Sequence, residues 1–307
     1  MKKITVVGAG FVGATAVQRI VEKELGDVVM IDVIEGMPQG KALDLMESAP
    51  IEGFDVEVMG TNDYKDIEGS DVVVITAGIA RKPGMSRDDL VKINSTIVSE
   101  VCENIKKYAP ESIVIVVTNP LDIMTHVALK MTEFHPSRVI GMSGVLDSAR
   151  FATFVAKELG CSARDVDAMV LGGHGDSMVP LPRLTTVSGV PITELMDDET
   201  IDRLVQRTIN GGAEIVELLK TGSAFYAPSA AITTMVASIV RDQKRILPAA
   251  VYLHGQYGHE GIYLGVPVKL GRMGVEAIVE LDLTESEQAM LERSADAVKK
   301  GISTLEI

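Results

Sequence analysis

Short apolar runs alternate with longer amphipathic segments through the first half of the chain. The runs are rich in β-branched residues and apolar at nearly every position, as in strands buried on both faces of a sheet. The six candidate strands are Ile4–Val7, Val28–Ile31, Val56–Met59, Val72–Thr76, Ile113–Val117 and Val139–Met142. Between them, segments such as Ala14–Glu24, Gly40–Glu47 and Val91–Tyr108 space apolar residues three and four apart, which indicates helices. This alternation predicts an α/β fold with a doubly wound parallel sheet of the Rossmann type.

The pattern changes near residue 145. Helical spacing predicts helices over 148–159, 200–220 and 229–241 and another from Glu285 onward, with one strand at Val166–Leu171. Short alternating runs with Gly and Pro turns over 249–280 are typical of an antiparallel sheet. We therefore expect residues 1–145 to form a dinucleotide-binding domain and residues 146–307 a mixed α+β substrate domain, in close contact across a cleft.

Composition and charge limit the partners. Hydrophobic residues make up 46% and charged residues 23%, the balance of an ordinary globular protein. The formal net charge of −14 repels nucleic acids and anionic membranes, so we expect neither as a partner. An anionic substrate would then need a local group of arginines.

Neither metal binding nor export is indicated. Cys102 and Cys161 lack metal-ligand spacing, and both lie in segments with helical periodicity, so we expect free thiols and no metal site. No apolar run approaches the length of a membrane span. The apolar run after Lys2 and Lys3 is too short for a signal peptide and fits a first strand better. We therefore expect a cytoplasmic protein.

A glycine-rich segment follows the first expected strand at once and opens a helix. Its residues are Gly8, Ala9, Gly10, Phe11, Val12 and Gly13, which match G-x-G-x-x-G. In this strand-to-helix context the first glycine permits a tight turn, the second lets the backbone approach a pyrophosphate, and the third allows close helix–strand packing. The pyrophosphate would lie at the helix N-terminus, where backbone N–H groups are unpaired.

Asp32 ends the second expected strand. A carboxylate at this point accepts hydrogen bonds from the adenosine ribose hydroxyls and repels a 2′-phosphate. No arginine follows it directly to bind such a phosphate. We therefore expect the cofactor to be NAD rather than NADP.

Two of the five histidines, His126 and His135, fit a helix surface and a turn, respectively. His174 stands apart. It lies between glycines in the segment Gly172–Ser177, directly after an expected strand, where the glycines leave room for a ligand. From this spacing alone, a catalytic base and an ordinary turn histidine are equally compatible with the sequence.

Four further segments occur in a fixed order after the glycine motif. They are Arg81–Arg87, Thr118–Pro120, Leu146–Arg150 and Gly172–Ser177. With these segments, the sequence resembles the lactate/malate dehydrogenase family over nearly its whole length. The resemblance implies hydride transfer between NAD and a small 2-hydroxy acid.

The resemblance also implies a role for each residue. His174 would be the acid/base that exchanges the hydroxyl proton. Asp147 would hold the other ring nitrogen and stabilise the imidazolium. Arg150 would bind the C1 carboxylate through two parallel hydrogen bonds. Asp147 and Arg150 are three residues apart at an expected helix start, so they can lie on one face.

The remaining implied contacts surround the reacting carbon. Arg87 would polarise the carbonyl oxygen from a segment rich in Pro, Gly and Ser, which could close over the substrate as a lid. Asn119 would donate a hydrogen bond to the same oxygen. Val117 and Thr118, through their backbone, and the side chain of Asn94 would line the nicotinamide end of the site.

Arg81 discriminates between substrates in this scheme. Lactate-type members carry glutamine at its position, because the methyl group of lactate offers an arginine no partner. Closing the lid over an unpaired arginine would cost roughly 2–5 kcal/mol, whereas a second carboxylate would pair with it. We therefore expect a preference for L-malate and oxaloacetate over L-lactate and pyruvate.

Two alternatives remain at this point. The chain could prefer lactate within the same family, or it could bind NAD without turnover as a sensor or structural subunit. Family members assemble as dimers or tetramers, so we expect a homo-oligomer. Only three residues precede the first expected strand, so we expect no N-terminal arm, and dimer and tetramer both stay open.

Overall fold

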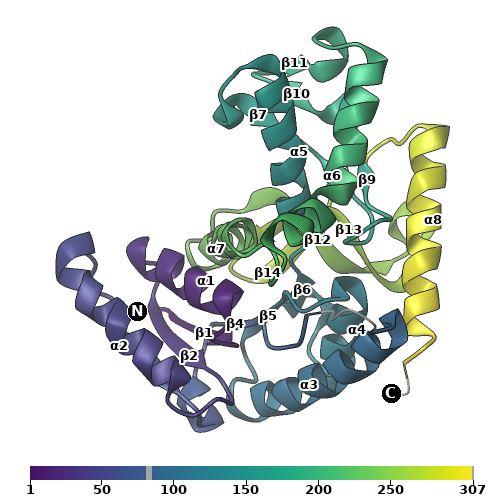
Figure 1. Ribbon diagram of the computed structural model, residues 1–307. Helices are drawn as coiled ribbons and strands as arrows, with labels where there is room; N and C mark the ends of the chain where they lie inside the picture. The colour runs from purple at the N-terminus through teal and green to yellow at the C-terminus, as the bar shows by residue number, and fades with distance from the viewer. Residues whose placement is uncertain (81–84, 306–307) are drawn as a thin grey trace.

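The computed structural model describes residues 1–80 and 85–305 (Figure 1). The α-helices are α1 (Phe11–Glu22), α2 (Met37–Glu52), α3 (Arg87–Tyr108), α4 (Leu121–Thr132), α5 (Gly144–Leu159), α6 (Asp198–Leu219), α7 (Tyr226–Val240) and α8 (Glu285–Ile302). The strands of the first half are β1 (Lys3–Val7), β2 (Asp27–Ile31), β3 (Val58–Thr61), β4 (Val72–Ile75), β5 (Ile113–Val116) and β6 (Val139–Gly141). Those of the second half are β7 (Val166–Asp167), β8 (Val170–Leu171), β9 (Val179–Pro180), β10 (Thr186–Val187), β11 (Val190–Pro191), β12 (Arg245–His254), β13 (Glu260–Gly271) and β14 (Gly274–Ile278).

The first six strands pair in parallel in the order β6-β5-β4-β1-β2-β3. This is the order of two mononucleotide-binding halves wound in opposite directions from the centre of the sheet. The predicted fold class, a Rossmann-type sheet followed by a mixed α+β region, is confirmed.

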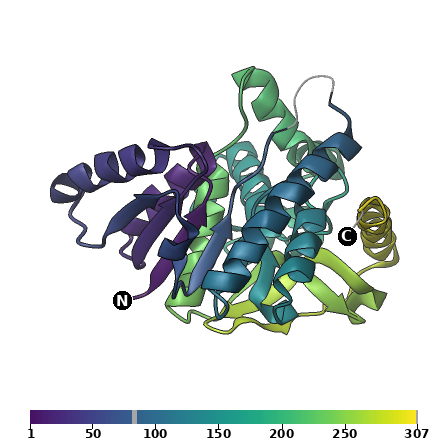
Figure 2. The same cartoon turned by 90° about the horizontal axis from the view of Figure 1, so that it is seen from below.

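Alternate side chains of each parallel strand enter different cores. Ile4 and Val6 pack on the face covered by α1 and α7, whereas Val7 packs on the face covered by α3 and α4. Figures 1 and 2 show α3 and α4 lying side by side along their face of the sheet. Because both faces are covered, the strands read as continuous apolar runs rather than alternating ones.

The antiparallel strands of the second half extend the same sheet. β12, β13 and β14 add to its edge in the order β14-β13-β12-β6, and Ala250 of β12 pairs with Gly141 of β6. The antiparallel sheet expected over 249–280 is therefore continuous with the parallel sheet, giving nine strands among the described residues. The predicted domain boundary at 145/146 falls within α5.

The prediction of one strand over Val166–Leu171 is wrong, because this segment forms two strands. Val166 and Asp167 form β7, which pairs with β10, whereas Val170 and Leu171 form β8, which pairs with β9. The chain changes sheets between these two strands, and a run of apolar residues carries no signal for that change. Cys161 also differs from expectation, because it lies just beyond α5, whose C-cap is Gly160.

Two helices, α3 and α8, begin with a reciprocal capping pair. The hydroxyl of Ser86 accepts the backbone N–H of Asp89, whose carboxylate accepts the N–H of Ser86, which starts α3. Thr284 and Glu287 form the same reciprocal pair at α8. Each pair satisfies N–H groups that the first turn leaves without helical partners.

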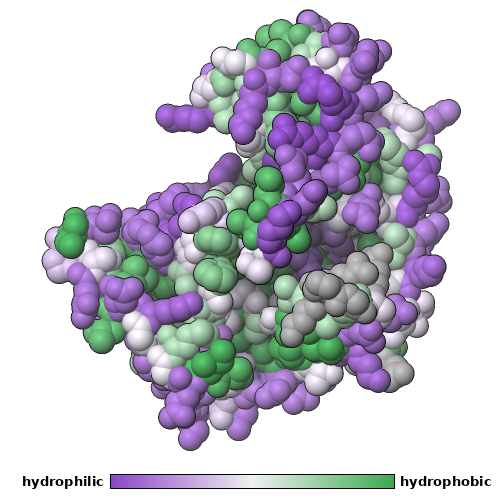
Figure 3. Space-filling model, in the orientation of Figure 1, coloured by the Kyte–Doolittle hydropathy of each residue, from purple (hydrophilic) through white to green (hydrophobic). Residues whose placement is uncertain are grey.

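The segment with α5, α6, β7, β10 and β11 rises away from the sheet in Figure 1. The space-filling view is hollowed between this segment and the part that carries α1 and α2 (Figure 3). No helix among the described residues combines the length and the apolar character needed to cross a bilayer.

Candidate active site

The glycine motif turns the chain sharply between β1 and α1. Gly8 has φ +105°, and a Cβ there would lie 2.6 Å from the hydroxyl of Thr76. A Cβ on Gly13 would overlap the carbonyl oxygen of Gly8. Both positions therefore require glycine, for the left-handed backbone and for close packing of the helix on the turn.

Gly10 has a different environment. A Cβ built on it would meet nothing within 4 Å, so the turn is open on this side. Helix α1 begins at Phe11 with no side-chain cap and no acidic residue in its first turn. The unpaired N–H groups and the positive end of the helix dipole are therefore available to an anion, as the pyrophosphate of NAD requires.

Asp32 is fixed against this turn. Its Oδ2 accepts the backbone N–H of Ala9 at 2.7 Å, and its Oδ1 accepts the N–H of Ile34 at 3.0 Å. Each carboxylate oxygen can accept a further hydrogen bond, so ribose hydroxyls could still bind. Lys41, which the sequence analysis did not single out, donates from α2 to the carbonyl of Ala9 at 2.6 Å. Its position on a helix nine residues beyond Asp32 gave no signal for this contact.

The residues predicted to line the nicotinamide lie in the loops after β4 and β5 and in α3. Thr118 donates to the carbonyl of Ala77 at 2.6 Å and lies beside Val117, whose N–H donates to Ile75. Asn119 is exposed and precedes Pro120 through a cis peptide bond.

Asn94 is fully buried in α3 and ties these two loops together. Its amide oxygen accepts the N–H of Ile79 at 2.9 Å, and its amide nitrogen donates to the carbonyls of Ile79 and Asn119 at 3.1 and 2.6 Å. Asn94 is therefore not a solvent-exposed helix residue. Its side chain orders the backbone from which Asn119 projects.

The structure brings His174, Asp147 and Arg150 together. Nδ1 of His174 lies 2.8 Å from Oδ2 of Asp147, and Nη1 of Arg150 donates to Oδ1 of the same carboxylate at 3.1 Å. Asp147 is 2% exposed, and the other two side chains are 13% exposed. With Nδ1 directed at the carboxylate, Nε2 is the ring nitrogen left to exchange a proton with a ligand.

Opposing effects set the protonation of the histidine. Burial lowers the pKa of His174, and the Arg150 charge lowers it further. The charge and hydrogen bond of Asp147, with a contribution from Asp122, outweigh both and raise the pKa above its ordinary value. These contacts therefore favour the protonated imidazole relative to an ordinary histidine.

Arg150 has donors left for an anion. Its Nε is buried with no hydrogen-bond partner among the described residues. Helix α6 passes directly behind it, because a Cβ on Gly211 would lie 3.3 Å from Arg150 Cδ. An unpaired buried guanidinium N–H is costly, so this group favours a site that receives a carboxylate.

Two predicted arginines cannot be placed in this geometry. Arg81 lies outside the described residues, as does the side chain of Arg87, although the backbone of Arg87 forms the first residue of α3. Ser86 is the N-cap of that helix, so the expected lid segment joins directly onto it.

Other histidines have structural surroundings. His126, expected at a helix surface, is buried in α4 at 8% exposure, so that expectation was wrong. Because α4 is packed on two sides, its sequence pattern does not distinguish a buried polar residue from an exposed one. His135 lies in a turn, where its ring accepts from the backbone of Ser137, as expected.

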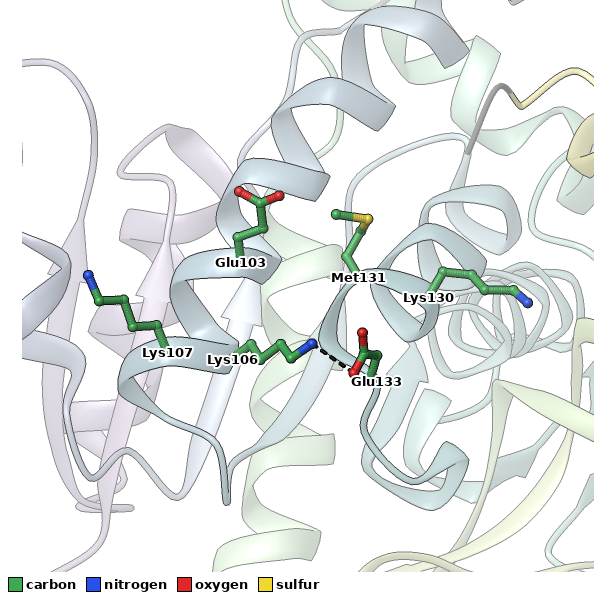
Figure 4. Close-up of a pocket in the computed structure, with 6 residues that line it drawn as sticks. All are labelled: Glu103, Lys106, Lys107, Lys130, Met131 and Glu133. Carbon is green, nitrogen blue, oxygen red and sulfur yellow. Dashed lines mark ion pairs between the residues drawn. The ribbon is translucent and has the colours of Figure 1, made fainter.

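A surface cavity lies away from these residues. It has a volume of about 400 Å³ between the ends of α3 and α4 and is lined by Glu103, Lys106, Lys107, Lys130, Met131 and Glu133 (Figure 4). Lys106 and Glu133 pair at 2.8 Å across it, with both side chains exposed. None of the predicted site residues lines this cavity, and it has the character of a solvated surface. No cluster of potential metal ligands occurs among the described residues.

Comparison with known proteins identifies the family of the chain. Residues 2–141 match the family model for the NAD-binding domain of lactate/malate dehydrogenase, and residues 144–306 match that for its alpha/beta C-terminal domain. The chain is 64% identical to the malate dehydrogenase of Methanosarcina mazei over the full length of both.

Solved structures of the family are equally similar in backbone. A malate dehydrogenase from Salinibacter ruber superposes with a TM-score of 0.95 at 51% identity, covering 99% of this chain and 97% of that one. A lactate dehydrogenase from Cryptosporidium parvum, complexed with lactic acid and NAD, gives 0.95 at 43% identity, covering 98% and 97%. Backbone similarity thus fails to separate the two substrate types. The matches to both family models and to full-length relatives nevertheless show that this chain belongs to the lactate/malate dehydrogenase family.

Proposed function

We propose that this chain catalyses the reversible, NAD-dependent oxidation of L-malate to oxaloacetate. The observation that carries the proposal is the contact of one buried carboxylate, Asp147, with both His174 and Arg150. Simple cofactor binding needs no such arrangement. It supplies an acid/base and a carboxylate anchor side by side, which is what a 2-hydroxy acid requires.

The residues divide the chemistry as follows. Arg150 holds the C1 carboxylate through its remaining donors, and Asn119 donates to the oxygen on C2. Nε2 of His174 removes the hydroxyl proton as the C2–H bond breaks, and Asp147 stabilises the resulting imidazolium. NAD, when bound, accepts the two electrons of that bond as a hydride. In the reverse direction His174 returns the proton to the developing alkoxide, with Arg87 offsetting its negative charge.

Two observations support malate over lactate. Arg81 stands where lactate-type members have glutamine, and its charge would pair with the second carboxylate of malate. The relatives with 62–64% identity over full length are named malate dehydrogenases.

The test is NADH oxidation followed by absorbance with oxaloacetate and with pyruvate under identical conditions. We expect kcat/KM to be higher for oxaloacetate by about 30-fold or more. A higher value for pyruvate would assign the chain to the lactate type. Binding of NADH without turnover of either keto acid would leave the chain a cofactor-binding protein.

We further propose a cytoplasmic homodimer or homotetramer. Large apolar side chains are exposed on α2 and α6, including Ile51 at 85% and Leu218 at 74%, and a subunit interface would cover such groups. Light scattering of the purified protein gives the assembly size. A monomeric mass would contradict this part of the proposal.

A further inference from the structure

Two side chains from distant parts of the sequence hold the backbone of the His174 loop. The N–H of Gly173 donates to the hydroxyl of Ser294 in α8 at 2.8 Å. The next N–H, that of His174, donates to Oδ2 of Asp122 in α4 at 2.9 Å. One attachment is therefore neutral and the other is a carboxylate, although a hydroxyl or an amide could accept either N–H group equally well.

Asp122 is enclosed. Its side chain is 6% exposed, and its Oδ1 has no hydrogen-bond partner among the described residues. Gly173 packs against it, since a Cβ there would lie 3.2 Å from Oδ2 of Asp122. Asp122 lies in the first turn of α4, three residues beyond Asn119, so one turn of chain carries both a substrate contact and the attachment of His174.

A carboxylate at this position is unfavourable for folding alone. Burial raises the pKa of Asp122 to about 6, and the negative charge of Asp147 adds to the rise. The N–H and the charge of His174 oppose it only in part. An asparagine would keep the hydrogen bond without the penalty for burying a charge. A buried carboxylate whose hydrogen bond a neutral side chain could also make is a candidate for a functional role.

The charged neighbours of this pair are few. Helix α5 contributes Asp147 and Arg150, whose charges act on His174 in opposite directions. Helix α8 presents Ser294 and Val298 to the loop, neither of which is charged. Asp122 is therefore the second negative group that acts on the imidazole, and it contacts the backbone N–H of His174 rather than the ring.

We propose that Asp122 is a positioning residue that fixes the backbone of His174 and whose negative charge favours the protonated imidazole. This inference rests on the proposed acid/base function of His174. It makes α4 responsible both for the place of the histidine and for its readiness to donate a proton. Asn119 precedes this helix by two residues, so the attachment of His174 and the group proposed to contact the substrate oxygen lie close together in the chain.

Three variants separate the anchoring of the His174 backbone from the effect of the Asp122 charge. Asp122→Asn keeps an acceptor for the His174 N–H and removes the charge. Asp122→Ala removes both. Ser294→Ala removes the neutral attachment one residue away and serves as the matched control.

The first measurement is kcat/KM for oxaloacetate reduction as a function of pH. In Asp122→Asn we expect the midpoint of its decline to move down by about 0.5–1 pH unit, with kcat on the acid side within about threefold of the parent. In Asp122→Ala we expect the same shift together with a fall in kcat of about tenfold or more, because the histidine is no longer held. Ser294→Ala should leave the midpoint in place.

The second measurement needs no turnover. Proteins labelled with ¹³C-histidine are titrated by NMR, and the His174 signal is assigned by its loss in His174→Gln. The imidazole pKa should fall in Asp122→Asn and stay unchanged in Ser294→Ala. A shift of this kind in a protein that fails to reduce oxaloacetate would reject the proposed function and leave the role of Asp122 standing.

Opposite results would overturn the inference. An unchanged imidazole pKa in Asp122→Asn would show that its charge does not act on His174. If Asp122→Asn lowered both the activity and the unfolding temperature and left the pH midpoint unchanged, Asp122 would be a structural residue only.

Discussion

One oxygen of Asp147 lies 2.8 Å from Nδ1 of His174, and this contact decides which ring nitrogen can exchange a proton. The carboxylate fixes the ring with Nε2 outward and stabilises the charge that the ring acquires. Its other oxygen accepts from Arg150, so the proposed acid/base and the proposed substrate anchor share one support.

Replacement of Asp147 by asparagine should therefore impair catalysis much more than folding. We expect kcat for oxaloacetate reduction to fall by about 10²–10⁴-fold, because a neutral amide neither fixes the productive tautomer nor stabilises imidazolium. Steady-state kinetics measure this. Asp176→Asn removes an exposed carboxylate from the same loop and should have little effect. Similar losses in both variants would argue against a specific role for Asp147.

The pH dependence should have opposite signs in the two directions. Oxaloacetate reduction needs the protonated ring, so its rate should decline as pH rises. Because the pKa of His174 is raised, the midpoint of this decline should lie above the ordinary histidine value of about 6.5. Malate oxidation needs the neutral ring and should decline as pH falls through the histidine's pKa in the complex with NAD. Initial rates from pH 5 to 10 check this. A reduction midpoint well below 6 would contradict the dominance of Asp147 over burial.

Arg81→Gln should change the substrate preference. The variant loses the partner for the second carboxylate, so kcat/KM for oxaloacetate should fall by about 30-fold or more, while pyruvate reduction persists or rises. Assays with both keto acids measure the ratio. Lys82→Gln removes a neighbouring positive charge and should keep the parental preference. If Arg81→Gln kept it as well, discrimination would reside in another contact.

Two glycines of one motif should respond differently to alanine. Gly13→Ala places a methyl group against the carbonyl of Gly8 and should destabilise the fold by about 1–3 kcal/mol, measured by urea unfolding. Gly10→Ala meets nothing within 4 Å and should fold normally. Its methyl group would stand in the approach to the pyrophosphate, so we expect weaker NADH binding by fluorescence titration. Unaltered NADH affinity in Gly10→Ala would place the pyrophosphate elsewhere.

The sequence predicted the parallel sheet well because burial on both faces leaves a local signature. Val72–Ile75 is buried at every position, and its unbroken apolar run can be recognised without knowing which strands it pairs with. The break between β7 and β8 and the pairing of Ala250 with Gly141 depend on which strands meet in space. Periodicity does not carry that information.

The site divides in the same way. His174, Asp147 and Arg150 were found because they lie in short ordered motifs, and the contact of Asp147 with the ring of His174 is as the motifs imply. The hydrogen bond from Arg150 to Asp147 was not predicted. Asp122 was missed because an aspartate in the first turn after a proline is ordinary helix-start chemistry. Its contact with His174 joins residues far apart in the chain, so only the folded arrangement reveals it.

The pairing of β12 with β6 has a consequence for attempts to divide the protein. Expressed alone, residues 1–145 would leave the outer edge of β6 without a neighbour, and residues 146–307 would do the same to β12. Strand edges left without a neighbour recruit other chains. Separate halves are therefore expected to aggregate, whereas mixing them during refolding should let each edge satisfy the other and restore a soluble, split enzyme.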